Sequence, residues 1–88
     1  MTTYQGWKNY ETWNISLWIS NDYGIYTAMR AARPFTPQTA ETFCREVFPH
    51  GTPDMAIGQH GETLSQTAAR ECLNLVDWQE IADDFNAE

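Results

Sequence analysis

Residues 6–19 read Gly6-Trp7-Lys8-Asn9-Tyr10-Glu11-Thr12-Trp13-Asn14-Ile15-Ser16-Leu17-Trp18-Ile19 and form the densest apolar run of the sequence. Three of the four tryptophans in this chain of 88 residues lie here. Large aromatic side chains bury much apolar area per residue, which helps so short a chain reach net stability. We therefore expect the core to be built on this stretch.

The same stretch is compatible with two secondary structures. A strand at 12–19 would explain an alternation of polar residues with the apolar residues Trp13, Ile15, Leu17 and Ile19. A helix would create one apolar stripe from Tyr10, Trp13, Leu17 and Trp18, widened by Ile15 and Ile19. We favour the helix, because Asn9 can cap it and no later segment offers matching alternation for a hairpin.

Two further helices are indicated in the next part of the chain. Asp22 can cap a helix that runs from Tyr23 to about Ala32. Thr36, followed by proline at the first helical position, begins another that runs to about Phe48. Residues 49–62 contain three glycines and two prolines, and they predict a loop that can hold one short helical turn.

The last part of the chain also carries helix signals. Glu62 or Thr63 begins a helix through about Leu73, and Asp77 with Glu80 three positions later resembles a capping box. The sequence therefore predicts an all-α fold, a single-domain bundle of four to five helices over residues 1–88. An α+β arrangement with a strand at 12–19 is the alternative.

Charge restricts the partners that the chain can bind. Twelve acidic and five basic residues give a net charge of −7, and the five basic residues are scattered along the sequence. Such a chain repels nucleic-acid phosphate and anionic lipid, so we expect no direct binding to nucleic acid or membrane. Attraction to a basic protein surface remains compatible with this charge.

Location and cysteine content are also informative. The N-terminus lacks the pattern of a signal peptide, and no apolar run is long enough to span a bilayer. We therefore expect a cytoplasmic protein, in which Cys44 and Cys72 are reduced, buried or half-buried thiols.

No arrangement of residues predicts catalysis. Cys44, His50, His60 and Cys72 could supply zinc ligands, but their spacing lacks the short pairs that pre-organise a site. Residues 60–62 have the His-x-Glu order of zinc deaminases without the Pro-Cys-x-x-Cys partner, and no nucleophile signature or phosphate loop is present. We expect a protein that is not an enzyme and has no metal or cofactor.

The final predicted helix separates apolar from acidic residues. Its apolar side consists of Trp78, Ile81, Ala82 and Phe85, and the opposite side of Glu80, Asp83 and Asp84. A solvated outer face is the ordinary interpretation of such charge. The functional interpretation is a recognition surface, because carboxylates one turn apart are spaced about 5–6 Å, comparable with neighbouring phosphates. Its candidate residues are Asp77, Glu80, Asp83, Asp84 and Glu88.

Aromatic residues near the N-terminus provide an alternative binding patch. Most of the aromatic residues are expected in the core, as a domain of this size requires. Trp7, however, precedes the helix cap, and with Tyr10 it could lie on an exposed rim that anchors a structural or regulatory partner.

The motif Trp7-Lys8-Asn9-Tyr10-Glu11-Thr12-Trp13-Asn14, followed by an apolar run and Asn21-Asp22, resembles a known family. That family comprises small, acidic, uncharacterised proteins of bacteriophages and other mobile elements. The resemblance covers residues 6–22 specifically, and it implies an accessory protein in the cytoplasm of a bacterial host. By analogy of size, charge and setting, we expect a nucleic-acid mimic that inhibits a host nucleic-acid-targeting defence complex, of the anti-CRISPR or anti-restriction type. Its partner would be a host protein or ribonucleoprotein with a basic surface.

Overall fold

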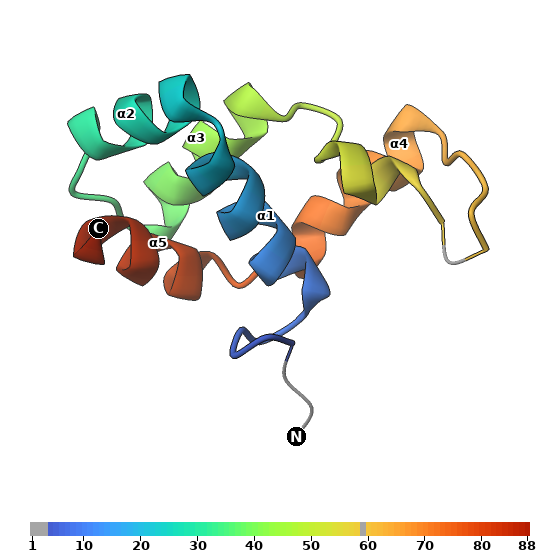
Figure 1. The fold of residues 1–88 in the computed structure, drawn as a ribbon, viewed down its shortest axis with the longest axis horizontal. Helices are drawn as coiled ribbons and strands as arrows, with labels where there is room; N and C mark the ends of the chain where they lie inside the picture. The colour runs from blue at the N-terminus through green and yellow to red at the C-terminus, as the bar shows by residue number, and fades with distance from the viewer. Residues whose placement is uncertain (1–3, 59) are drawn as a thin grey trace.

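The computed structural model describes residues 4–58 and 60–88, and this part of the chain forms a bundle of helices (Figure 1). Its elements are α1 (Tyr10–Asn21), α2 (Tyr23–Ala31), α3 (Pro37–Val47), the 3-10 helix η1 (Pro53–Ala56), α4 (Gln66–Glu71), the 3-10 helix η2 (Cys72–Leu75) and α5 (Trp78–Ala87). The predicted all-α fold is confirmed. The alternative strand at 12–19 is wrong, because these residues lie within α1.

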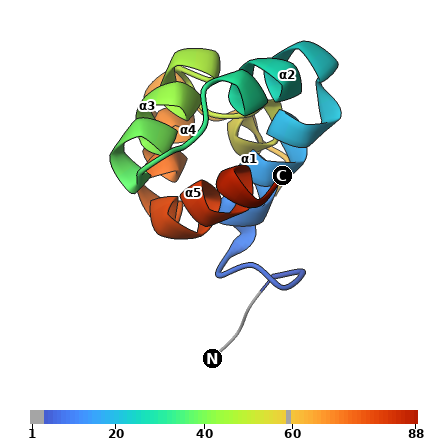
Figure 2. The same ribbon diagram turned by 90° about the vertical axis from the view of Figure 1, so that its left-hand side faces the viewer.

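The helices enclose one hydrophobic core. In Figure 1, α1 crosses the middle of the molecule, with α2 above and α5 below it, and Figure 2 shows α3 on the opposite side of the bundle from α1. Three phenylalanines join α3 to α5: the Phe35 ring lies 5.6 Å from Phe43 and 5.1 Å from Phe85, between ring centroids. The buried core residues are Ile15, Ile19, Met29, Phe35, Ala40, Cys44, Met55, Leu73, Val76, Ile81, Ala82 and Phe85.

The helices begin where local capping signals predict. Side-chain oxygens of Asn9, Asp22, Thr36 and Asp77 accept hydrogen bonds from main-chain N–H groups in the first turns of α1, α2, α3 and α5. Each such bond satisfies one of the donors that a helix leaves free at its N-terminus. The predicted short helical turn in residues 49–62 is confirmed as η1, whose cap is Thr52.

The helix predicted to run through about Leu73 is present, but its predicted start at Glu62 or Thr63 is wrong, because α4 begins at Gln66 with Ser65 as its cap. Residues before it fold back on the preceding segment: the Leu64 N–H donates to the Ala56 carbonyl at 2.8 Å, and Gly58 donates to the Glu62 carbonyl at 2.8 Å. These hydrogen bonds between the two sides of the loop occupy main-chain groups that a helix starting at residue 62 or 63 would need. The helical path then continues beyond α4 as η2.

The buried face of α1 also differs from the predicted stripe. Thr12, Asn14, Ile15 and Ile19 are buried, whereas Tyr10, Trp13, Leu17 and Trp18 are only half-buried. The helix is rotated so that two polar side chains face inward and the tryptophans lie along its edges. None of the helices in the described ranges is long and apolar enough to cross a membrane.

Candidate functional site

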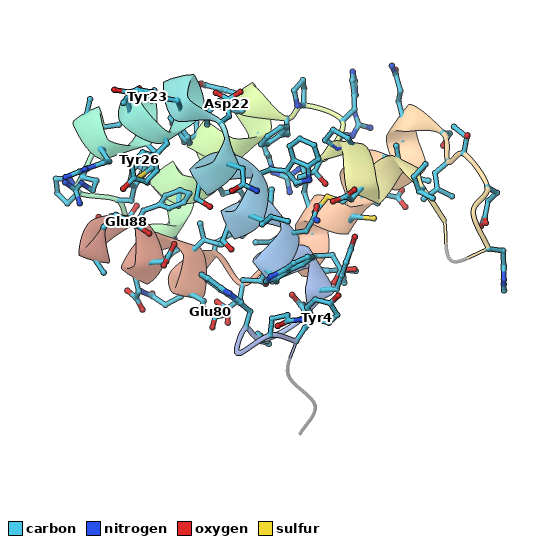
Figure 3. All side chains as sticks on the ribbon, in the orientation of Figure 1. Tyr4, Asp22, Tyr23, Tyr26, Glu80 and Glu88 are labelled. Atoms are coloured by element: carbon cyan, nitrogen blue, oxygen red, sulfur yellow. The ribbon has the colours of Figure 1, made fainter. Side chains whose placement is uncertain are left out.

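The five predicted acidic residues lie along α5 and its cap, on the side away from the core. Ile81, Ala82 and Phe85 are buried, which confirms that the apolar residues of this helix face inward. Asp83 and Glu88 are exposed, and the other three acidic residues are half-buried. Figure 3 shows Glu80 and Glu88 near opposite ends of the helix.

Asp77 and Glu80 hold the N-terminal segment against the start of α5. The Asp77 carboxylate accepts from the N–H groups of Gln79 and Glu80 at 3.1 Å and lies 3.8 Å from the Lys8 ammonium. Glu80 accepts from the Lys8 N–H at 3.0 Å, instead of returning to the cap as a reciprocal capping box would require. The predicted box is therefore only half present, because the Asp77 N–H donates to the Thr12 hydroxyl at 2.9 Å.

Glu80, Asp84 and Glu88 follow one another at intervals of four residues and form what we call the acidic row. Partial burial raises the pKa of Asp84, and the neighbouring charges of Glu88 and Glu80 raise it further. No ion pair joins these three carboxylates to a basic side chain in the described ranges. The row is therefore a concentration of negative charge that repels itself.

The far end of the acidic row contacts α2. The Tyr26 hydroxyl donates to the Glu88 carboxylate at 3.2 Å, and the two side chains lie side by side in Figure 3. The guanidinium of Arg33 donates to the main-chain oxygen of Glu88. Asp83 projects from another side of α5, where it accepts from the Gln79 amide at 2.9 Å. The predicted face thus divides into the acidic row and the separate Asp83.

The two predicted aromatic residues are placed differently. Trp7 is half-buried and packs against the core. Tyr10 instead belongs to the aromatic cluster, defined by Tyr4, Tyr10 and Trp13, whose ring centroids lie 5.0 to 5.6 Å apart. A tight turn brings Tyr4 to this cluster: Tyr4 and Trp7 exchange two main-chain hydrogen bonds of 2.7 Å. This turn was not predicted.

The intervening residues of that turn are Gln5 and Gly6, whose φ values of 52° and 85° suit a tight reversal. Glycine adopts such a value without strain. The Gln5-Gly6 pair was the sequence signal for the turn.

A polar network that extends from the buried Asn14 and Thr52 to the exposed Asp54 joins α1 to η1. The Asn14 amide donates to the Asp54 carboxylate at 2.7 Å, and the Thr52 hydroxyl donates to the Asn14 carbonyl oxygen. The Trp18 indole donates to the same Asp54 oxygen at 2.9 Å. Asn14 and Thr52 are almost completely buried, with 0% and 1% of their surface exposed. Sequence reasoning missed this network, although an asparagine within an apolar helix was a signal for it.

A second polar contact joins the start of α1 to the turn before α5. The Asn9 side chain accepts from Thr12 while its amide donates to the Leu75 carbonyl at 2.7 Å. The Thr12 hydroxyl in turn accepts from Asp77. The polar residues of the motif at 7–14 therefore position neighbouring segments of the fold.

A half-open cavity of about 810 Å³ lies between α1, η1, η2 and residues 57–58 and 60–64, and we call it the loop pocket. Its described lining includes Tyr10, Glu11, Asp54, Met55, Leu64 and Cys72. Nothing in the sequence predicted it, because it forms where three stretches that are separate in sequence meet: the start of α1, η1 with the loop that follows it, and η2. No lysine or arginine is among its described lining residues.

The possible zinc donors are not gathered into one site. Cys44 lies in the core, where burial raises the pKa of its thiol to about 12, while Cys72 and His60 line the loop pocket. Across residues 4–58 and 60–88, no three acidic, histidine or cysteine side chains are placed to hold one metal ion. Both thiols are free, and they are buried and half-buried as predicted.

Fold and surface define a small helical protein with one negatively charged helix face and a separate half-open pocket. The chain belongs to DUF7249, a family of unknown function whose model matches residues 1–87. This match agrees with the expectation of an uncharacterised family. Comparison with curated proteins and with solved structures found no match.

Proposed function

We propose that this protein is a non-enzymatic accessory protein that binds a basic surface of a host nucleic-acid-targeting complex and thereby inhibits it. The acidic row is the observation that carries the proposal. Its three carboxylates remain close together although their mutual repulsion opposes folding, and Asp84 is partly desolvated in addition. Side chains that reduce stability are typical of surfaces selected for binding.

The charge of the row suits a partner that normally holds nucleic acid. A basic channel attracts carboxylates spaced one helical turn apart much as it attracts consecutive phosphates. Electrostatic attraction would accelerate association, and occupation of the channel would exclude the nucleic acid. Glu80 and Glu88 are held by hydrogen bonds from Lys8 and Tyr26, so part of the row is already ordered before binding.

The setting of the proposed activity comes from the resemblance of residues 6–22 to proteins of phages and other mobile elements. In that setting, a small acidic protein in the cytoplasm of the bacterial host would act as an anti-CRISPR or anti-restriction protein. It would protect the mobile element from CRISPR or restriction complexes. The acidic row would replace nucleic acid in such a complex.

A plating experiment tests this proposal. The protein is expressed in bacteria that carry one defined restriction or CRISPR system, and a phage targeted by that system is plated. We expect a higher plating efficiency with the wild-type protein, and loss of that gain when Glu80→Gln, Asp84→Asn and Glu88→Gln are combined. Glutamine and asparagine keep the hydrogen-bonding shape of each side chain while removing its charge.

The matched control combines Glu41→Gln, Glu46→Gln and Glu71→Gln, which removes the same net charge from other parts of the surface. It should protect the phage as the wild type does. Equal protection by both triple variants would overturn the role of the acidic row. Failure of the wild-type protein against a panel of restriction and CRISPR systems would overturn the inhibitory function.

The aromatic cluster favours a second candidate, a structural or regulatory protein-interaction module. Tyr4 exposes 38% of its surface while its ring packs on Tyr10 and Trp13, so the cluster offers a pre-ordered apolar patch. In this case Tyr4→Ala would abolish association with the partner without unfolding the protein. Binding would also be insensitive to salt, which distinguishes this candidate from the first.

A further inference from the structure

The loop pocket has an apolar interior and an acidic rim. Met55 is buried beneath it, and Leu64 contributes a half-buried aliphatic side chain. Glu11 and Asp54 approach the same space from α1 and η1. A cavity of about 810 Å³ exceeds the volume of a single side chain, so it can also hold the backbone that carries one.

Asp54 bonds to neighbouring residues of the fold, and together with Glu11 it also places negative charge beside the pocket. Asp54 uses Oδ2 for its bonds to both Asn14 and Trp18, and no described donor contacts its Oδ1. Burial raises the pKa of the Tyr10 phenol, and the charges of Asp54 and Glu11 raise it further. Burial likewise raises the pKa of the Cys72 thiol, with Glu11 as the next cause. The contributions of Glu11 and Asp54, which are smaller than that of burial, agree with the placement of both carboxylates beside the pocket.

An aromatic wall completes the site. Tyr10 lines the pocket and packs against the rings of both Tyr4 and Trp13, which restrict its orientation. A ring with a fixed orientation next to carboxylates is a favourable environment for a cation, because the ring face is negative. The cavity, the carboxylates and the ring therefore favour the same kind of ligand.

We propose that the loop pocket binds an arginine side chain presented by a partner protein. The aliphatic stem of arginine would pack on Met55 and Leu64, and its planar guanidinium would stack on Tyr10. Several N–H donors in a fixed geometry would then contact Glu11 and the free oxygen of Asp54. Lysine offers a compact, strongly hydrated charge that stacks less well, so arginine is the better fit.

This site goes beyond the proposed function, because no residue of α5 lines the loop pocket. Glu62 does not belong to the cation-binding group. Its carboxylate turns back to accept from the His60 N–H at 2.9 Å and closely approaches Gly58. Binding can therefore be tested without knowing the target of the acidic row.

The experiment is an NMR titration of the full-length, ¹⁵N-labelled protein with small probes. The first probe is the blocked peptide Gly-Gly-Arg-Gly-Gly, and the second replaces arginine with citrulline, which has nearly the same shape without the charge. We expect the arginine peptide to shift amides of Glu11, Asp54, Met55 and Leu64, and the citrulline peptide to leave them in place. A lysine peptide should bind more weakly.

Two variants locate the binding. Glu11→Gln should weaken binding of the arginine peptide about fivefold, since it removes one of two charge-assisted contacts at a partly exposed site. Tyr10→Leu should weaken it by a similar factor through loss of stacking. The matched control Glu46→Gln removes a carboxylate from α3, outside the pocket, and should leave the affinity unchanged.

Several outcomes would overturn the proposal. Equal shifts with arginine and citrulline would show that charge does not matter, and shifts confined to α5 would place the cation on the acidic row. Unchanged affinity in Glu11→Gln would exclude the assigned contact. Spermidine that binds more tightly than the arginine peptide, with the same shifts, would identify a free polyamine as the occupant.

Discussion

Helices α1 and α5 carry the clearest sequence patterns in this protein, and they use polar residues in opposite ways. On α5, apolar side chains are buried and carboxylates face outward, as periodicity predicts. On α1, Thr12 and Asn14 are completely buried, while Trp13 and Trp18 are only half-buried. The carboxylates of α5 lie at the surface of the molecule, whereas Thr12 and Asn14 of α1 bond to groups inside it.

The difference shows what decides which face of a helix is buried. A polar group can enter a core when its hydrogen-bonding capacity is satisfied there. Asn14 bonds to residues 38 and 40 positions away in sequence, and Thr12 to one 65 positions away. In the described ranges no buried side-chain nitrogen or oxygen lacks a partner. The burial of these residues therefore follows from the tertiary fold.

The largest expected effect tests which apolar residue of α1 belongs to the core. Ile15 is fully buried, so Ile15→Ala should lower the free energy of unfolding by about 3 kcal/mol through lost burial and a residual cavity. Trp13→Ala removes a larger side chain from a half-buried position and should lower it by about half as much. Urea denaturation measures both, and a larger loss for Trp13→Ala would contradict the observed orientation of α1.

The polar network is tested by Asn14→Leu, which replaces the amide with an apolar group of similar size. We expect a loss of about 2 kcal/mol, because the Thr52 hydroxyl and the Asp54 carboxylate would each lose a partner. Ser20→Ala is the control on the same helix, since Ser20 is exposed and bonds only to carbonyls of its own helix. A stable Asn14→Leu variant would mean that the network does not hold η1 in place.

A smaller effect is expected at Thr12→Val, which keeps the side-chain shape and removes the hydroxyl. The variant loses the hydrogen bonds to Asn9 and to the Asp77 N–H, so its free energy of unfolding should be lower by about 1 kcal/mol. Thr27→Val is the matched control, because the exposed Thr27 hydroxyl bonds only to carbonyls of α2. Similar losses for the two variants would remove the distinction between inward and outward polar residues.

The smallest effect concerns the acidic row and has the opposite sign. Because the pKa of Asp84 is raised in the folded protein, its contribution to stability is greatest at low pH and falls as pH rises above its ordinary value of 3.8. Asp84→Asn should therefore become more stable than the wild type by about 0.3 kcal/mol at neutral pH, after allowance for solvent screening. Thermal unfolding at about pH 3 and pH 7 measures this difference, with Asp83→Asn as the control for charge removal. A less stable Asp84→Asn variant at neutral pH would contradict it.

Local signals predicted most of the fold. The caps at Asn9, Asp22, Thr36 and Asp77 depend on residues within one turn, so the starts of four helices could be predicted from the sequence. The start of α4 could not, because contacts between residues 56 and 64 compete with helix formation.

The same difference between local signals and contacts distant in sequence decided which parts of the candidate site could be predicted. The acids of α5 were predicted because helical periodicity is local. The loop pocket and the polar network were not, because each assembles groups from several separate segments. The turn that brings Tyr4 to Tyr10 lay between these cases, since its glycine was visible but its destination was not.

The central claim is that the acidic row of α5 binds a basic partner by charge. The most direct measurement is the Kd for a partner that co-purifies with the wild-type protein, determined for wild type and for the Glu80→Gln/Asp84→Asn/Glu88→Gln variant between about 50 and about 300 mM salt. We predict that wild-type binding weakens steeply with salt, while the variant binds at least about tenfold more weakly at low salt with little salt dependence. Equal affinities and equal salt dependence for the two proteins would contradict the account.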